Sequence, residues 1–177
     1  MRGPKLQEMA RFVNDIVDEG APMLPKVILA PTDLSETAEE AVDYACELAR
    51  TLGAKLHLLH VIAVPVVGVP ELGLAMTSTM IDSMIKDNQT ALDALAARKA
   101  AAADLAPTIL RTGDARDVIN QTAKEIGADL IVVGTHGRRG VTRVLLGSVA
   151  ETVVRTAPCP VLTVRMEKHE DSKSDAA

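Results

Sequence analysis

With 177 residues, 24 of them acidic and 19 basic, the chain has the length of one domain and a net charge of −5. The chain has no basic tract, which argues against nucleic-acid binding. Its two cysteines, Cys46 and Cys159, are too few for a disulfide framework and lack metal-ligand spacing. No stretch approaches a membrane span and the N-terminus lacks a signal peptide's apolar run, so we expect a cytoplasmic protein without membrane insertion.

The first 24 residues predict a helical extension in front of the domain. Apolar side chains recur there at helical spacing, and the pattern breaks at Gly20 and Pro22. The stripe must pack on the domain, on a second subunit or on a client protein.

The domain begins with a strand, a helix and a second strand. The run from Val27 to Ala30, which follows Lys26, is apolar on both faces and predicts a buried strand ended by Pro31. The helix that follows has Ser35 as its N-cap and Gly53 as its C-cap. Only two residues separate that glycine from the next strand, 56–62, and such short connections are typical of βαβ units.

The rest of the chain repeats this alternation after a long Pro- and Gly-rich segment, 63–78. The predicted elements are a helix over 81–103, a strand over 108–111, a helix from about Ala115, a strand over 129–133, a helix over 148–156 and a strand over 161–165. The long helix is expected to turn these side chains inward: Ile81, Met84, Ile85, Leu92 and Leu95.

Strands that alternate with helices predict an α/β fold, a Rossmann-like open five-stranded parallel sheet with helices on both faces. We assign residues 25–166 to this domain and 167–177 to a charged flexible tail. Ligands of such sheets bind beyond the carboxyl ends of the strands, where the strand order reverses.

A glycine-rich segment follows the fourth predicted strand, with Gly134, Gly137 and Gly140 early in it and Gly147 and Ser148 at its end. Glycines let backbone amides approach a phosphate, and the amino end of the last helix favours an anion. Three basic residues add positive charge: Arg138, Arg139 and Arg143.

Two structural interpretations of this segment stay open. The early glycines could be turn residues only, and Ser148 with Glu151 could form a capping box that needs no ligand. Neither a dinucleotide-binding Gly-x-Gly-x-x-Gly after the first strand nor a P-loop is present.

The glycine spacing resembles the ATP-binding signature of the universal stress protein family. Two glycines separated by two residues are followed, after nine more, by Gly-Ser at a helix start. The resemblance covers about residues 25–166 and includes Pro-Thr-Asp-Leu-Ser from residue 31, Leu-His-Val from residue 59 and Pro-Cys-Pro-Val-Leu from residue 158. It implies ATP binding, accompanied by Mg²⁺, and the following contact residues: Pro31, Thr32, Asp33, Val61, Val133, Gly134, His136, Gly137, Arg138, Gly147, Ser148 and Val149.

By this resemblance Asp33 would hold the ribose or the adenine edge, Val61 would offer its backbone to adenine and Val133 would line the base pocket. The phosphates would be held by Gly134, Gly137, Gly147, Ser148 and Val149. A carboxylate at a strand end can accept from two ribose hydroxyls, but it can also be a turn residue before a helix. His136 could touch a phosphate, and a lone histidine without a neighbouring acid is not expected to be catalytic. His57 and His60 lie on a strand without metal-ligand spacing, so we predict no protein-only metal site.

Three functions follow from these features. The favoured one is a nucleotide-dependent sensor or regulator in stress responses, read by an unidentified protein client; the alternatives are a slow ATPase or phosphotransferase and an interaction module that ignores nucleotides. The last strand, from Val161 to Arg165, is an apolar edge, and similar proteins pair it with its copy, which predicts a homodimer. Alternatively, the N-terminal helix covers that edge.

Overall fold

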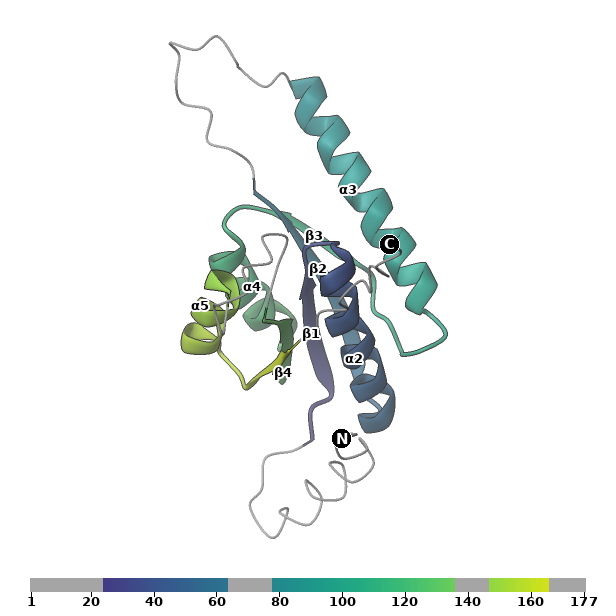
Figure 1. Ribbon diagram of the computed structural model, residues 1–177, viewed down its shortest axis with the longest axis vertical. Coiled ribbons are helices and arrows are strands. Elements are labelled where there is room, and N and C mark those ends of the chain that lie inside the picture. Colours follow the sequence, from purple (N-terminus) through teal and green to yellow (C-terminus); the bar gives the residue numbers. More distant parts are fainter. Residues whose placement is uncertain (1–23, 64–77, 136–146, 166–177) are drawn as a thin grey trace, which may run out of the picture.

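Five parallel strands form the central sheet of the computed structural model, which describes residues 24–63, 78–135 and 147–165 (Figure 1). They are β1 (Val27–Thr32), β2 (Lys55–Ile62), β3 (Ile109–Thr112), β4 (Leu130–Gly134) and β5 (Val161–Val164). Their spatial order is β3-β2-β1-β4-β5, and every pairing between neighbours is parallel. The predicted open parallel sheet is therefore confirmed, with strand ends shifted by one residue for β2 to β5.

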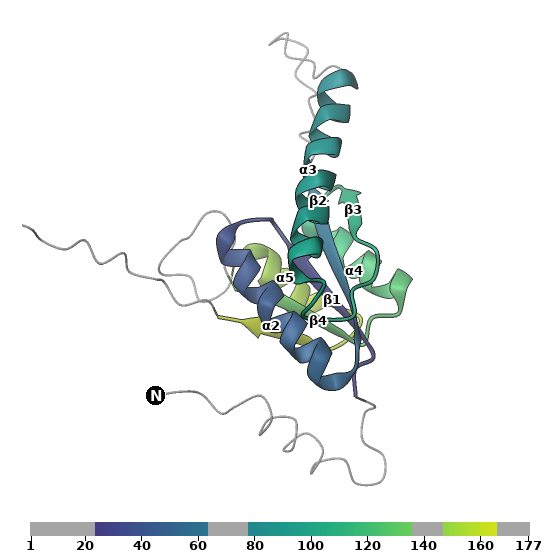
Figure 2. The same ribbon diagram turned by 90° about the vertical axis from the view of Figure 1, so that its right-hand side faces the viewer.

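Helices cover both faces of the sheet, as predicted (Figures 1 and 2). They are α2 (Glu36–Leu52), α3 (Ser78–Lys99), α4 (Ala115–Ile126) and α5 (Ser148–Thr156). One core cluster joins α2 and α3 to side chains such as Ile28 and Leu58, and the other joins α4 and α5 to Leu29 and Leu59. Because successive strand residues point to opposite faces, the two clusters take alternate positions of the same strands.

The helix ends follow the predicted capping chemistry at α2. The Ser35 side chain accepts a hydrogen bond from the amide of Ala38, and Gly53 closes the helix with a φ of 64°. The other side uses the same devices, since Asp114 caps the start of α4 and Gly127, with a φ of 63°, ends it. No helix among the described residues is long and apolar enough to cross a membrane.

The prediction that Pro31 ends the first strand is wrong, because β1 continues through Thr32. Pro31 pairs with Leu59 of β2, while the pairing of β1 with β4 stops at Leu29. The Val27 carbonyl accepts from the amide of Asp129, just before β4, so the backbone groups of the odd-numbered residues of β1 point towards β4. Pro31 is one of these residues, and its missing N–H would point beyond the place where the pairing with β4 stops.

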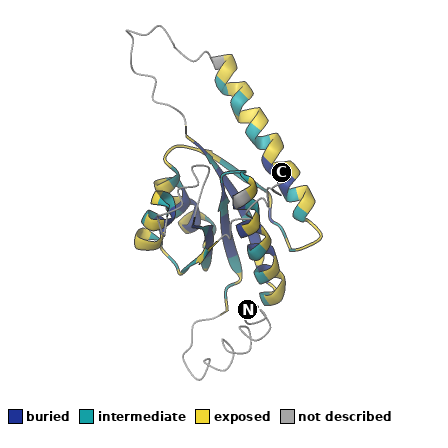
Figure 3. Ribbon diagram, viewed as in Figure 1, coloured by how far each residue is buried: buried dark blue, intermediate teal, exposed yellow. Residues whose placement is uncertain are grey.

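The long helix α3 begins earlier and ends earlier than predicted, and its apolar stripe is not buried throughout. Leu92 and Leu95 are buried against the sheet, but Ile85 is 36% exposed. The first half of α3 extends beyond the sheet and is mostly exposed (Figure 3), because no other described helix or strand covers it. Cys46 of α2 lies in the core and is 1% exposed.

Candidate functional site

The strand order reverses between β1 and β4, where the chain leaves β1 towards β2 on one side and reaches β4 on the other. β1 pairs with β2 along its whole length, up to Thr32 and His60, whereas its pairing with β4 covers only Ile28 and Leu29. The carboxyl halves of β1 and β4 are thus not joined by a ladder. This is the position at which a doubly wound sheet opens a crevice for ligands.

The turn that follows β1 is held by its own side chains. The amide of Leu34 donates to Oγ1 of Thr32 at 3.1 Å. Both the amide and the hydroxyl of Ser35 donate to Oδ1 of Asp33, at 3.0 and 2.5 Å. Leu34 has a φ of 63°, in the left-handed region that is costly for a branched side chain. Asp33 therefore does serve as a turn residue, and it does so at the strand end where the sequence places a ribose ligand.

The amino end of α5 lies directly against the end of β4. The amide of Gly147 donates to the carbonyl of Thr135 at 2.7 Å, and a Cβ added at Gly147 would come within 3.1 Å of that oxygen. A side chain at this position would crowd the Thr135 carbonyl, so glycine favours the close backbone approach. The residues between, 136–146, lie outside the described part of the chain, and with them the predicted ligands His136, Gly137 and Arg138.

The alternative that Ser148 caps α5 is wrong. The N-cap is Gly147, and Ser148 is the first helical residue; Glu151 meets the cap through a backbone bond, its amide donating to the Gly147 carbonyl at 2.8 Å. Gly147 offers no side-chain cap, and no side chain of the described residues is seen to cap this helix start. Its first amides are therefore available to an anion, which the helix dipole also favours.

The predicted base-binding residues share one face of the sheet with α5. Val133 belongs to the core cluster beneath α4 and α5, and both Val61 and Val149 of α5 pack against this cluster. Pro31 follows Leu29 by two residues and so faces the same side. The residues predicted to contact the base and the amino end of α5 thus lie on the same face of the sheet, on which the β1–β4 opening also lies.

The two histidines of β2 differ in their surroundings. Burial, followed by the nearby Lys55, lowers the pKa of His57, and its Nδ1 is buried without a partner. His60 is 5% exposed and lies between the end of β1 and α3, with Nδ1 2.8 Å from the Thr32 carbonyl oxygen and Nε2 3.0 Å from Oδ1 of Asn88. Sequence reasoning missed this contact. The available indication was that strand alternation places His60 on the same face of β2 as Leu56 and Leu58.

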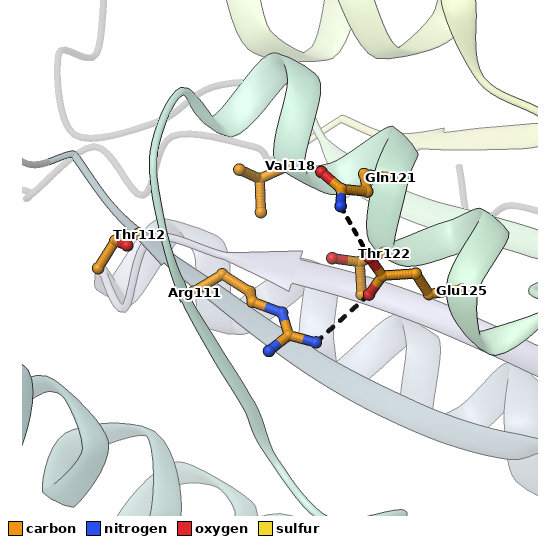
Figure 4. A pocket seen from close by; sticks show the side chains of 6 residues that line it. All are labelled: Arg111, Thr112, Val118, Gln121, Thr122 and Glu125. Atoms are coloured by element: carbon orange, nitrogen blue, oxygen red, sulfur yellow. Dashed lines mark hydrogen bonds and ion pairs between the residues drawn. The ribbon is translucent and has the colours of Figure 1, made fainter.

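A cavity of about 390 Å³ lies apart from these residues, between β3 and α4 (Figure 4). It contains an ion pair of Arg111 and Glu125, 3.3 Å apart, and Gln121 also donates to Glu125 at 2.8 Å. None of the predicted nucleotide ligands lines it. Because its polar groups satisfy one another, the cavity by itself indicates no ligand.

The thiols and the charged groups of the described residues offer no further reactive centre. Burial raises the pKa of both Cys46 and Cys159, which disfavours the reactive thiolate form. Within the described ranges no group of three or more His, Cys, Asp or Glu side chains could hold a metal ion.

Comparisons with known proteins agree with this architecture. The model of the universal stress protein family matches residues 25–165. Universal stress protein MJ0531 of Methanocaldococcus jannaschii is 34% identical over 161 residues, 90% of this chain and 92% of that protein. The solved structure of UspA from Lactobacillus plantarum superposes with a TM-score of 0.67 at 30% identity, over 79% of this chain and 97% of that one. A universal stress protein in complex with cAMP has a TM-score of 0.61 at 25% identity, over 81% of this chain and 99% of that one.

Proposed function

The chain belongs to the universal stress protein family, and we propose that it binds ATP at the carboxyl ends of β1 and β4. The amino end of α5 is the observation that carries this proposal. Its N-cap is Gly147, it lies against Thr135 at the end of β4, and its first backbone amides have no side-chain acceptor among the described residues. An anionic group with several oxygens, such as a triphosphate, would satisfy those amides.

The remaining parts of the nucleotide have residues of fitting chemistry nearby. In this proposal Asp33 accepts from the ribose hydroxyls, Val61 offers backbone groups to adenine, and Val133 and Pro31 supply apolar contact. The related structure in complex with cAMP supports an adenine nucleotide as the ligand class. Gly134, Ser148 and Val149 would hold the phosphates and Thr32 would line the space beside them, with His136, Gly137 and Arg138 contributing from the segment after β4.

The divalent ion of the proposal comes with the nucleotide. The described residues hold no cluster of carboxylates and histidines for a metal, so Mg²⁺ would be bound chiefly by phosphate oxygens and water. When bound, it would neutralise part of the phosphate charge. The protein's own part is to present amides and to exclude water from the base.

We further propose that the protein acts in the cytosol as a nucleotide-dependent regulator of stress responses. Both cysteines are free, which suits a reducing compartment. Binding would favour one conformation of the chain, and a protein client would respond to that conformation.

A homodimer through β5 is part of this proposal. β5 is the outer strand of the sheet, and the carbonyls of Pro160 and Val164 accept from β4, both at 3.0 Å. Since successive residues alternate sides, Val161 and Thr163 direct their backbone groups outward. That edge is apolar and would pair with its own copy.

Isothermal titration calorimetry with ATP and Mg²⁺, on protein freed of nucleotide, tests the binding site. Asp33→Asn keeps an oxygen that can accept from Ser35, so the turn should persist, but it removes the charge offered to the ribose. We expect roughly tenfold weaker binding. Arg111→Gln, in the cavity between β3 and α4, is the matched control and should bind as the wild type does.

Two results would contradict the proposal. Absence of saturable ATP binding by folded wild-type protein would favour an interaction module that works without nucleotide. Weaker ATP binding by Arg111→Gln but not by Asp33→Asn would indicate that the nucleotide binds in the β3–α4 cavity instead.

A further inference from the structure

A single buried histidine connects α3 to the turn after β1. His60 of β2 has its Nδ1 2.8 Å from the carbonyl oxygen of Thr32 and its Nε2 3.0 Å from Oδ1 of Asn88. The amide nitrogen of Asn88 donates to the carbonyl of Met84 at 2.8 Å. The Met84 carbonyl can only accept, so this bond turns Oδ1 of Asn88 towards the histidine, and both partners of the ring are then acceptors. Both contacts are hydrogen bonds when both ring nitrogens carry a hydrogen.

The Thr32 carbonyl lies where β1 has lost one of its neighbours. Pairing with β4 stops at Leu29, and beyond it β1 is held by β2 alone. The next residues adopt a turn in which Leu34 has a φ of 63°. A strained backbone conformation of that kind persists only when contacts with the surrounding structure hold it in place. On one side Thr32 Oγ1 accepts from the Leu34 amide, and on the other the Thr32 carbonyl faces His60.

Asn88 stands at the point where α3 reaches the sheet. Leu92, one helical turn further on, is fully buried, whereas Met80 and Ile85 before it are 56% and 36% exposed. The first half of α3 projects past the sheet in both views (Figures 1 and 2). The histidine therefore joins the base of this projecting half to the end of β1.

We propose that His60, oriented by Asn88, is a positioning residue that fixes the turn carrying Asp33 and so couples α3 to the nucleotide site. Its effect on ATP rests on the function proposed above; its effect on the turn does not. The imidazole contacts no nucleotide in this scheme and acts only through the Thr32 carbonyl.

Two amide substitutions separate the two contacts of the ring. In His60→Asn the amide nitrogen takes the place of Nδ1 and can still donate to Thr32, whereas in His60→Gln it takes the place of Nε2 and reaches only Asn88. Asn88→Leu leaves the ring but removes its orienting partner. Gln89→Leu is the matched control on α3, because it removes bonds to Asp93 and Thr108 and leaves His60 untouched.

Hydrogen exchange of the Leu34 and Ser35 amides, measured without nucleotide, reports on the turn directly. We expect exchange about tenfold faster in His60→Gln and Asn88→Leu, and near the wild-type rate in His60→Asn and Gln89→Leu. ATP affinity measured on the same proteins should fall about tenfold in the first two and be retained in the others. Thermal unfolding of each variant checks that the fold is intact; if His60→Gln does not fold, Asn88→Leu gives the same comparison.

The outcomes discriminate between the two proposals. Unchanged exchange at Leu34 and Ser35 in folded His60→Gln or Asn88→Leu, or equal acceleration in Gln89→Leu, would overturn the positioning role. Faster exchange with undiminished ATP affinity would overturn the coupling to the site. Faster exchange in a protein whose wild type binds no ATP would confirm the turn-holding role and refute the nucleotide proposal instead.

Discussion

Substitution of Gly147 can separate the stability of α5 from its proposed use in binding phosphate. Gly147 is the N-cap of α5, with a φ of −67° and a ψ of 152°, a conformation that any residue can adopt. The obstacle to a side chain is therefore contact with β4, not backbone strain. Alanine adds only the Cβ, whereas serine adds the same Cβ and a hydroxyl that can cap the helix.

The cost of the Cβ follows from its position. It would lie 3.1 Å from the Thr135 oxygen, whereas ordinary contact of this kind begins at 3.4 Å, so the chain must move by a few tenths of an ångström. The Gly147 amide and the Thr135 oxygen, now 2.7 Å apart, would move with it. In Gly147→Ala the weakened hydrogen bond lowers the free energy of unfolding by about 1 kcal/mol, and alanine as the N-cap lowers it by about 0.5 kcal/mol. The less flexible unfolded chain raises it by about 0.7 kcal/mol.

We therefore expect Gly147→Ala to be about 1 kcal/mol less stable than the wild type, which lowers Tm by about 2 to 4 °C. Gly147→Ser should recover about 1 kcal/mol, because its hydroxyl accepts from the first amides of α5. Those are the amides that the phosphates would use. ATP affinity of Gly147→Ser should accordingly fall at least tenfold while its stability stays near that of the wild type.

Thermal unfolding and calorimetry with ATP and Mg²⁺ measure the two quantities on the same samples. Gly127→Ala is the control, because Gly127 has a φ of 63° with open space around its Cα, and alanine there costs about 1 kcal/mol far from the site. It should lose stability and keep affinity. Wild-type affinity in Gly147→Ser would refute the use of the α5 amides for phosphate.

Two further predictions concern the dimer and the response to acid. Thr163→Pro removes an outward-facing N–H of β5 without touching the bonds to β4, so light scattering should give a monomer with an unchanged circular dichroism spectrum; a persisting dimer would place the interface elsewhere. Hydrogen bonds from Lys99 and then Arg98 hold the pKa of Glu39 below its usual value, so this contribution is present above about pH 4.5 and is lost as the pH falls through the lowered pKa. Lys99→Met should cost about 1 kcal/mol at pH 7, and urea unfolding should show the difference narrowing below pH 4.5; a difference independent of pH would contradict the ion pair as its cause.

The sequence was sufficient for the order and type of the elements because their signals are local. Ser35 and Gly53 mark the two ends of α2 by capping chemistry alone. Apolar runs such as 130–133 predict buried strands wherever they occur. Strands alternating with helices then permit few arrangements other than a covered parallel sheet. The glycine spacing after β4 indicated the family by the same kind of local pattern.

Other features depended on contacts between residues distant in sequence. Pro31 reads locally as a strand end, yet it remains in β1 because the ladder to β4 has already stopped on the side where its N–H is missing. Locally, Ser148 has the features of a helix cap. In the structure Gly147, which bonds to Thr135, is the N-cap, so the helix starts one residue earlier and no described side chain caps its first amides. His60 and Asn88 lie 28 residues apart and meet only because α3 packs over β2. Local pattern thus determined the sheet and its helices, whereas tertiary packing decided which backbone groups at the site are already satisfied and which are offered to a ligand.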